Sequence, residues 1–560
     1  MARELDWITT TPEHSYRSIF RWGNPSVFKH PNHRLVEYMI SRFSLSEKDL
    51  QPSSTGREIL DRKVPVRLGS ARISELTKIV GKSNISVDTY DRVVASYGKT
   101  MIDLFRLRDK VLENIPDAVL YPSDAAQVAR ILKFAVKNRI SINTKGAGSS
   151  VTRGFEAERG GLTLDLSRHM KRIQKLDPVN QTVTVEPGIL LPDLESQLQK
   201  ASAAFGSPYN YTLGHFPQSY EFATVGGAVV TRGAGQNSTY YGKIEHLVLS
   251  QHYVTPAGDI VTREIPAKST GPDLDWMLMG SEGTFGILVS VTLKLHRYMP
   301  ENTRRFSYMF KDFESALGAA REILQSEGGF PSVFRLSDPE ETDIAMRLYG
   351  VHGSILDRAL KVLGYRPHSR CLLLGTADGN PKYSSLVRSN VARIARRFGA
   401  FPTTSYVTKK WEHGRFLDPY MRDDLMDFGV IIDTLECSTS WANLPHVHST
   451  VRKACHENAD AVVMCHLSHL YPQGANLYFI FIARMNRKQF TDYHKKVVSA
   501  IAASGAAISH HHGIGRLLAP WMEKAQGPVA MGAIRSLKQY FDPAGTLNPG
   551  VLGIGAKKKR

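Results

Sequence analysis

The sequence predicts an α+β fold divided among several domains, and three observations support this class. The chain has 560 residues, which is too long for one hydrophobic core and indicates two or three domains. Residues 112–297 alternate short strands and helices with glycine-rich loops, whereas residues 298–500 alternate strands and helices without them. Hydrophobic residues make up 42% of the chain, which is typical of a folded globular protein.

Residues 1–111 are predicted to form an N-terminal helical region. The stretch "HRLVEYMISRFSL" carries apolar residues at helical spacing among basic ones. The opening "MARELDWITTTPEHSY" has no apolar core segment, so we expect no signal peptide. No run of about 18 apolar residues occurs, so we expect no transmembrane helix.

A strand, a helix, a second strand and a glycine loop are predicted for "IPDAVLYPSDAAQVARILKFAVKNRISINTKGAGSS". Ser123 or Asp124 is the expected N-cap of the helix. Its buried face is expected to consist of Val128, Ile131, Leu132 and Ala135. Further along, Gly258 is expected in the turn of a hairpin, and a strand rich in β-branched residues follows "GSEGTFGI".

Residues 298–500 are predicted to form a substrate-binding domain with an antiparallel sheet. "FSYMFKDFESALGAAREIL" and "LYFIFIARMNRKQFTDYHKKVVSAI" each contain a strand followed by an amphipathic helix. Residues 501–560 carry "SHHHGIGR" and are expected to return to the glycine-loop domain. The final "AKKKR" is expected to be a solvated end and is no Ser-Lys-Leu type peroxisomal address.

The charge of the chain is strongly basic, at +18 from 71 Lys and Arg against 53 Asp and Glu. This excess is consistent with a solvated surface, or with attraction to anionic ligands or an anionic membrane. No nucleic-acid motif accompanies it, so we expect no nucleic-acid partner. The four cysteines form no C-x-x-C pair, which favours a reducing compartment.

Four glycine-rich segments lie in residues 112–297: "TKGAGSSVTRG", "QSYEFATVGG", "TRGAG" and "GSEGTFGI". Glycines let a backbone approach a ligand and direct its N–H groups at anionic oxygens. The first segment is no nicotinamide fingerprint, because Val151 takes the third glycine position. One such loop is typical of a structural turn, but four in one domain favour a pyrophosphate ligand wrapped from several sides.

The order and spacing of these segments resemble the flavin-binding domain of the vanillyl-alcohol oxidase family of PCMH-type flavoproteins. Within the family, the chain resembles the members that form the ether bond of ether lipids, from about Trp22 to Leu552. The resemblance is carried by "YPSDAAQVARIL", "EFATVGGAVVTRGAG", "YGKIEHLV", "STGPDLDWMLMGSEGTFGI", "SVFRLSD", "LYFIF" and "SHHHGIGR". It implies a two-subdomain PCMH-type FAD-binding domain at 112–297, an antiparallel-sheet cap domain at 298–500 and a helical N-terminal region.

The resemblance implies that four segments hold FAD. They consist of Thr144, Lys145, Gly146, Ala147, Gly148, Ser149 and Ser150; Gln218, Ser219, Tyr220, Glu221, Phe222, Ala223 and Thr224; Thr231, Arg232, Gly233 and Ala234; and Glu282, Gly283, Thr284, Phe285, Gly286, Ile287 and Leu288. Ser149 and Ser150 stand where some relatives attach flavin through a histidine, so we expect a non-covalent cofactor.

The implied reaction releases the acyl group of an acyl-dihydroxyacetone phosphate as a fatty acid and replaces it with a long-chain fatty alcohol. FAD acts without net redox and holds the ketose phosphate covalently between the two steps. The resemblance makes Tyr478 the acid–base group. A tyrosine with a pKa near 10 is a poor base at neutral pH, so nearby cations are expected to help ionise it. His510, His511 and His512 are expected to do this or to shuttle protons, with His511 foremost.

Two arginines complete the implied site. Arg422 in "PYMRDD" matches a substrate-binding arginine of the family, and Arg335 in "SVFRLSD" matches one needed for activity. A guanidinium can clamp a phosphate or carboxylate through two bonds, although an arginine in an ordinary ion pair is the alternative. No metal is expected, because the run after His466 and His469 lacks the acidic residue and final histidine of related metal-binding motifs.

Two other functions stay open at this point. One is an FAD-dependent 2-hydroxyacid dehydrogenase of the lactate or glycolate type, which "LNPGVLG" resembles and the missing metal ligands disfavour. The other is a lipid-surface binding protein without catalysis. The implied partners are the two lipid substrates, a peripheral membrane surface and a second copy of the chain. The expected compartment is peroxisomal in a eukaryote and cytoplasmic in a prokaryote, with no targeting signal evident.

Overall fold

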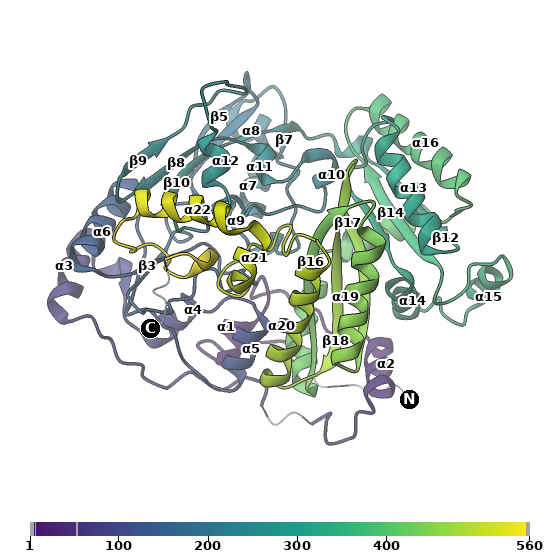
Figure 1. Cartoon of the computed structure of the whole chain (residues 1–560), viewed down its shortest axis with the longest axis horizontal. Coiled ribbons are helices and arrows are strands. Elements are labelled where there is room, and N and C mark those ends of the chain that lie inside the picture. Colours follow the sequence, from purple (N-terminus) through teal and green to yellow (C-terminus); the bar gives the residue numbers. More distant parts are fainter. Residues whose placement is uncertain (1–4, 6, 52–53, 556–560) are drawn as a thin grey trace.

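The computed structural model describes residue 5, residues 7–51 and residues 54–555, and it confirms the α+β class (Figure 1). The expected solvated end at 556–560 lies outside the described residues. The N-terminal region is helical and consists of α1 (Tyr16–Phe20), α2 (His33–Phe43), α3 (Ser70–Val80), α4 (Thr89–Val94) and α5 (Met101–Arg108). It also supplies strand β1 (Ile85–Ser86) to the first sheet.

The first subdomain of the glycine-loop domain is a four-stranded sheet in the order β1-β2-β4-β3. Its strands β2 (Ala118–Leu120), β4 (Leu162–Asp165) and β3 (Ile142–Lys145) run parallel. Helix α6 (Ala125–Asn138) packs on this subdomain with the four expected apolar residues buried. Asp124, rather than Ser123, caps the helix by accepting a hydrogen bond from the Gln127 N–H at 2.8 Å.

The second subdomain is a five-stranded antiparallel sheet in the order β5-β6-β10-β8-β9. Its strands are β5 (Ile173–Asp177), β6 (Thr182–Val185), β8 (Val248–Thr255), β9 (Gly258–Val261) and β10 (Ile287–Lys294). Gly258 ends the expected turn with φ +122°, and β10 is the expected strand after "GSEGTFGI". The helices between these strands are α7 (Leu191–Leu198), α8 (Ala201–Phe205), α9 (Val225–Thr231), α10 (Ser238–Tyr241), α11 (Ile244–Leu247) and α12 (Leu274–Leu278).

The cap domain contains the expected antiparallel sheet, which has seven strands in the order β15-β12-β14-β13-β17-β18-β16. The strands are β12 (Arg304–Phe310), β13 (Phe334–Ser337), β14 (Cys371–Ala377), β15 (Phe401–Pro402), β16 (Val430–Ser440), β17 (Ala461–Tyr471) and β18 (Gly474–Arg484). Its helices are α13 (Phe313–Gln325), α14 (Pro339–Leu348), α15 (Ile355–Val362), α16 (Pro381–Arg397), α17 (Ser405–Gly414), α18 (Met421–Leu425), α19 (Leu444–Asn458) and α20 (Arg487–Ala503).

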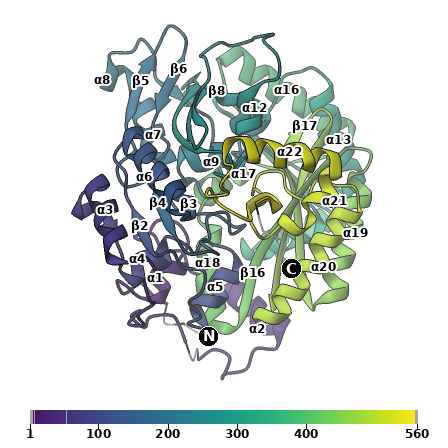
Figure 2. The ribbon, with the colours of Figure 1, turned by 60° about the vertical axis from the view of Figure 1, so that its left-hand side comes forward.

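The C-terminal segment lies between the two large domains, where Figures 1 and 2 show it in yellow. It starts on the cap sheet, because Ala507 forms an antiparallel bridge with Ser438 of β16. It ends on the first subdomain, because Leu547 forms a parallel bridge with Ile142 of β3. Helices α21 (Met522–Gln526) and α22 (Pro528–Phe541) lie between these two contacts. The histidine loop therefore lies where the domains meet.

The hydrophobic core joins the domains as well. One cluster of buried side chains extends from Val291 of β10 to Phe479 of β18, and a second joins Ile131 and Leu162 of the first subdomain to Val254 and Val289 of the second. A rigid junction of this kind suits a site built from both domains. None of the described helices is both long enough and apolar enough to span a bilayer.

Candidate active site

A buried carboxylate on the cap sheet organises the three consecutive histidines. Glu436 of β16 accepts hydrogen bonds from the backbone N–H groups of His510, His511 and His512 at 2.7–3.1 Å. The Ser509 hydroxyl donates to the same carboxylate at 2.8 Å. Because Glu436 is only 3% exposed, these donors are what makes its burial tolerable. The loop is thus fixed by its backbone, which leaves the imidazoles available for other contacts.

A second buried carboxylate holds the end of the same loop from the opposite domain. Glu282 accepts hydrogen bonds from the N–H groups of Ile514 and Gly515 at 2.7 and 2.8 Å. Burial raises the pKa of Glu282 to about 7. Gly515 has φ +54°, and a Cβ added there would lie 1.9 Å from the Thr152 carbonyl oxygen. Only glycine fits this close approach, which explains part of the "HHHGIGR" pattern.

Tyr478 lies among imidazole rings on β18, next to the edge strand β16 of the cap sheet. It pairs with Glu436 across β16 and with His466 across β17. Its ring stacks on His466 with centroids 4.9 Å apart and on His511 at 5.9 Å. His512 meets it edge-on at 5.5 Å. The structure therefore brings Tyr478, His511 and His512 together, as the sequence resemblance implied.

His510 points elsewhere. Its Nε2 lies 2.7 Å from the Tyr471 hydroxyl, and its ring stacks on His469 rather than on Tyr478. Its Nδ1 lies 3.1 Å from Nδ1 of His511. His510 can therefore reach Tyr478 only through His511, and the three histidines divide into two roles.

The charge state of these groups differs from the sequence expectation. Burial lowers the pKa values of His510 and His511 well below 6.5, and also lowers that of His512. Burial, with Glu436 and Asp433, raises the pKa of Tyr478 to about 12. Neutral histidines supply no positive charge that would help ionise Tyr478, and the alternative role of proton shuttle stays a prediction. Tyr478 is a proton donor here, and its hydroxyl donates to Thr434 Oγ1 at 3.1 Å.

Arg335 reaches the site through an ion pair. Its Nη2 lies 2.5 Å from the Glu341 carboxylate of α14, which also contacts His466 Nδ1 at 3.2 Å. Burial opposes ionisation of Glu341, yet Arg335 and His466 together hold its pKa at about 2. His466 in turn stacks on Tyr478. Arg335 is thus connected to Tyr478 through Glu341 and His466. Its observed contacts are those of an ion pair, which was the alternative to binding a phosphate or carboxylate.

Arg422 of α18 is 7% exposed, and its positive charge partly opposes the rise in the pKa of Tyr478. Its Nη1 donates to the Lys99 carbonyl at 3.2 Å, and its Nη2 donates to Asp433 at 3.1 Å. Its Nε is buried without a hydrogen-bond partner. A buried donor without a partner costs free energy, so a ligand that accepts from it is favoured.

The four glycine-rich segments converge, although they are far apart in the sequence. A Cβ added to Gly146 would meet Thr224 Oγ1 at 2.2 Å, which places the first two segments in contact. A Cβ on Gly283 would meet Thr144 Oγ1 at 3.8 Å. A Cβ on Gly513 would meet Thr231 at 3.5 Å, so the histidine loop adjoins the third segment.

The residues at this convergence fit FAD. The hydroxyl of Thr144, the amide of Asn143 and the amide oxygen of Asn548 are buried without partners, and a polar cofactor would satisfy them. A small hollow adjoins the first two segments; it is lined by Trp22, Gly23, Lys99, Ser149, Gln218, Ser219, Glu221 and Phe222.

Several implied cofactor residues have side chains engaged elsewhere. Lys145 pairs with Asp165 at 2.7 Å, and Arg232 contacts Glu245 at 3.4 Å. Phe285, Ile287 and Leu288 are buried in hydrophobic cores. At these positions any contact with FAD falls to the backbone, and the roles of the individual residues stay predictions.

Sequence reasoning missed several residues of the site. Glu436 and Glu341 belong to no recognisable motif. From the sequence alone, a glutamate in a strand or helix is expected to be exposed to solvent, because the partners that allow its burial are not known. Lys99 and Trp22 come from the N-terminal region, for which only helices were predicted. Burial lowers the pKa of Lys99 to about 8. A lysine in the stretch "VVASYGKTMIDL" gives no signal that it lines a hollow with Ser149 and Gln218.

The fold and the site define an FAD-linked flavoprotein enzyme, and comparison with known proteins agrees. Residues 116–263 match the FAD binding domain family, and residues 299–552 match the family of FAD linked oxidases, C-terminal domain. The chain is 30% identical to an alkyldihydroxyacetonephosphate synthase of Dictyostelium discoideum, over 85% of this chain and 80% of the relative. It is 29% identical to the synthase of Trypanosoma brucei brucei, over 90% and 83%.

A solved structure of an alkyldihydroxyacetonephosphate synthase superposes with a TM-score of 0.79 at 27% identity, covering 95% of this chain and 99% of that one. The chain belongs to the alkyldihydroxyacetonephosphate synthase family of FAD-dependent enzymes. The implied PCMH-type fold and the FAD cofactor are confirmed.

Substitution of Glu436 tests whether its carboxylate holds the histidine loop. In Glu436→Gln, the amide retains only one acceptor oxygen for four donors, so the loop should loosen. We expect faster hydrogen exchange in a peptide that spans residues 509–513, measured by mass spectrometry. Glu412→Gln, which removes a partly exposed partner of Arg305, is the control and should leave that peptide unchanged. Equal exchange in the two variants would contradict the role of Glu436.

The Glu341 ion pair predicts a pH dependence of stability. The folded pKa of Glu341, about 2, lies below the unfolded value of 4.5. The ionised carboxylate therefore stabilises the folded state fully above about pH 4.5, and this stabilisation is lost as pH falls toward 2. We expect the stability gap between wild type and Glu341→Gln in urea unfolding to shrink by about 2 kcal/mol from pH 6 to pH 3. The gap for Glu412→Gln should change less, and a gap for Glu341→Gln that is constant with pH would refute the depressed pKa.

Proposed function

We propose that the enzyme exchanges the acyl group of an acyl-dihydroxyacetone phosphate for a long-chain fatty alcohol and so forms the ether bond of an ether lipid. The observation that carries this proposal is the arrangement around Tyr478. Its ring lies between His466 and His511, close to buried Arg422, in a family whose named members are alkyldihydroxyacetonephosphate synthases. The cofactor is proposed to be non-covalent, since serines occupy positions 149 and 150.

Arg422 and Lys99, which contact each other through the Lys99 carbonyl, suit the phosphate of the substrate. Arg422 has a free buried Nε, and Lys99 lines the hollow beside the first two glycine segments. A guanidinium and an ammonium in a site of low dielectric bind a phosphate more strongly than they would in water. Arg335 has its charge directed at Glu341, so we assign it to positioning His466 rather than to binding phosphate.

Proton transfer in the exchange falls to Tyr478 and its histidines. Protonated Tyr478 can donate to a leaving oxygen, and neutral His511 can receive the proton that is removed from the carbon beside the carbonyl. His510 then passes the proton on, because its Nδ1 lies 3.1 Å from that of His511 and its Nε2 contacts Tyr471. When bound, FAD supplies the nucleophilic chemistry of the exchange.

An isotope experiment tests this function. Purified enzyme with FAD receives palmitoyl dihydroxyacetone phosphate and a labelled fatty alcohol without oxygen, and mass spectrometry identifies the products. We expect labelled alkyl ether and released palmitate without net change in the flavin redox state. Tyr478→Phe and His511→Ala should each lower the rate by about 10²–10⁴-fold, because they remove an acid–base group.

Tyr540→Phe and His252→Ala are the controls for that experiment. Tyr540 is exposed on α22 and His252 contacts Asp259 on the β8–β9 hairpin, so neither belongs to the arrangement around Tyr478 and their rates should match wild type. Flavin reduction by lactate or glycolate, with no ether product, would instead establish the 2-hydroxyacid dehydrogenase. A protein that binds no added FAD would refute both enzymes and leave the lipid-binding alternative.

We propose that helix α15 attaches the enzyme to a membrane surface, as two membrane-derived substrates require. Figure 1 shows α15 at the edge of the cap domain, projecting from the sheet. Apolar side chains are exposed along it and beside it, namely Tyr349, Ile355, Leu356, Val362 and Leu363. Arg347, Arg358 and Arg366 are exposed among them. In residues 345–369 the single acidic residue is Asp357, which is buried against Arg370, so this surface complements an anionic bilayer.

Vesicle flotation tests this attachment. Ile355→Asp combined with Val362→Asp should weaken binding to vesicles of phosphatidylcholine and phosphatidylglycerol at least about tenfold, because two exposed apolar side chains that would enter the bilayer are lost. Val179→Asp, which changes an equally exposed valine between β5 and β6, is the matched control and should bind normally. Normal flotation of the double variant would refute α15 as the docking surface. The compartment and a homodimer stay predictions.

A further inference from the structure

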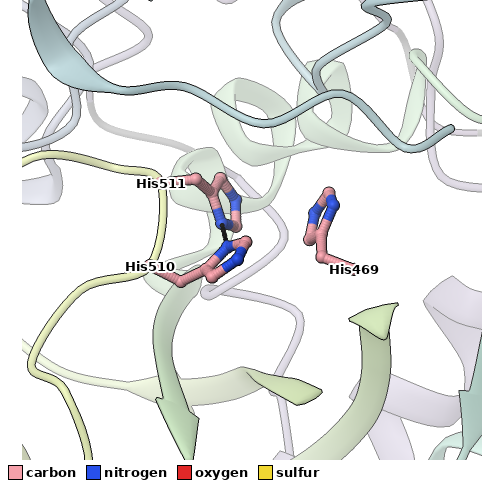
Figure 3. Close-up of side chains that lie close together, drawn as sticks. All are labelled: His469, His510 and His511. Atoms are coloured by element: carbon pink, nitrogen blue, oxygen red, sulfur yellow. Dashed lines mark hydrogen bonds between the residues drawn. The ribbon is translucent and has the colours of Figure 1, made fainter. Parts of the chain in front are cut away.

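We propose that His469, His510 and His511 form a binding site for a divalent transition-metal cation such as Zn²⁺. One ring nitrogen from each histidine lies within 4.8 Å of the others. Figure 3 shows the three rings facing a common space, with His469 on β17 and the other two on the C-terminal loop. From the sequence no metal is expected beside His466 and His469, because the run that follows them lacks further ligands; the fold adds His510 and His511 from the C-terminal loop.

The backbone aims His469 at this space. His469 is the extra residue of a bulge in β17, where the pairing register with β18 shifts between Ser468 and Leu470. It has φ +52°, a left-handed conformation that is uncommon for a residue with a side chain. Bulges of this kind redirect a side chain and are frequent at functional sites. A histidine that only lined a pocket would not need this strained backbone.

The outer nitrogens of His469 and His510 each have an oxygen partner that fixes the ring. His469 Nδ1 lies 2.7 Å from the Ser238 hydroxyl, and His510 Nε2 lies 2.7 Å from the Tyr471 hydroxyl. When these nitrogens carry the protons, Nε2 of His469 and Nδ1 of His510 present lone pairs to the common space. Partners of this kind orient the histidine ligands of metal sites.

The spacing within the loop already suits a tetrahedral ion. Nδ1 of His510 and Nδ1 of His511 lie 3.1 Å apart. Two nitrogens bound to Zn²⁺ at about 2.0–2.1 Å with tetrahedral geometry lie about 3.3 Å apart. A cation would take the place of the proton that the two nitrogens share, and a small rotation of His469 would complete three ligands.

The surroundings select the kind of cation. Burial keeps the three imidazoles neutral, which is the form that binds metals. Glu436 Oε2 lies 3.7 Å from His511 Nδ1 and offers negative charge nearby, while the charge of Lys243 is offset by Glu245 at 3.1 Å. Three nitrogen ligands favour Zn²⁺, Co²⁺, Ni²⁺ or Cu²⁺ over Mg²⁺ and Ca²⁺, which take oxygen ligands.

The cation is an inhibitor rather than a cofactor, and this consequence rests on the proposed function. His511 stacks on Tyr478, and a metal on its Nδ1 would stop it from passing a proton to His510. Binding itself does not depend on the reaction that the enzyme performs.

A cobalt titration of the FAD-loaded enzyme tests the site. After dialysis against a chelator, Co²⁺ is added and its visible d–d absorption is followed beside the flavin bands. We expect one equivalent to give a tetrahedral spectrum that Zn²⁺ removes. His469→Gln should abolish it, and Ser238→Ala should weaken Co²⁺ binding about 10–100-fold by freeing the ring. The flavin bands report in the same spectrum whether each variant remains folded.

His252→Gln is the matched control. His252 contacts Asp259 on the β8–β9 hairpin and should not affect the cobalt spectrum. Absence of a tetrahedral spectrum in wild type, or an unchanged affinity in both His469→Gln and Ser238→Ala, would overturn the site. Release of palmitate, measured with and without Zn²⁺, separates the two proposals. Tight binding without inhibition would retain the site and overturn its link to the exchange.

Discussion

The rest of the site depends on the hydrogen bonds by which two buried carboxylates hold the backbone of the histidine loop. Glu436 holds three consecutive backbone N–H groups from the cap sheet, and Glu282 holds the next two donors from the glycine-loop domain. Since the backbone is satisfied in this way, the imidazoles are free to meet Tyr478 on one side and His469 on the other. The same grip joins the two domains at the place where the glycine segments converge.

Burial sets the chemistry of this junction. Desolvation keeps the histidines neutral and Tyr478 protonated, and the fixed charges occur in pairs such as Arg335 with Glu341 and Arg422 with Asp433. The site therefore holds a proton donor, Tyr478, close to proton acceptors, the imidazoles, while both kinds of group are uncharged. A bound phosphate would change this balance of charges at Arg422, and a bound metal cation would change it at His469.

Much of the fold was predictable from local pattern. The face of α6, the hairpin at Gly258 and the strand–helix pairs of the cap follow from the periodicity of apolar residues and from turn chemistry, which act over a few residues. The choice of Asp124 over Ser123 as the helix cap was left open by the sequence, because both side chains are capable caps. Strand β1 was missed, because two residues are too few to show a period.

The sequence by itself determined the family, the glycine segments, Tyr478 and the three histidines, because these are carried by residue types in fixed order. Only the tertiary structure decided what those residues do together. It divided the histidines between Tyr478 and His469, showed them to be neutral, and connected Arg335 to the site through Glu341. Protonation and orientation depend on burial and on partners hundreds of residues away, such as Glu282 for Gly515, and no local pattern encodes that distance.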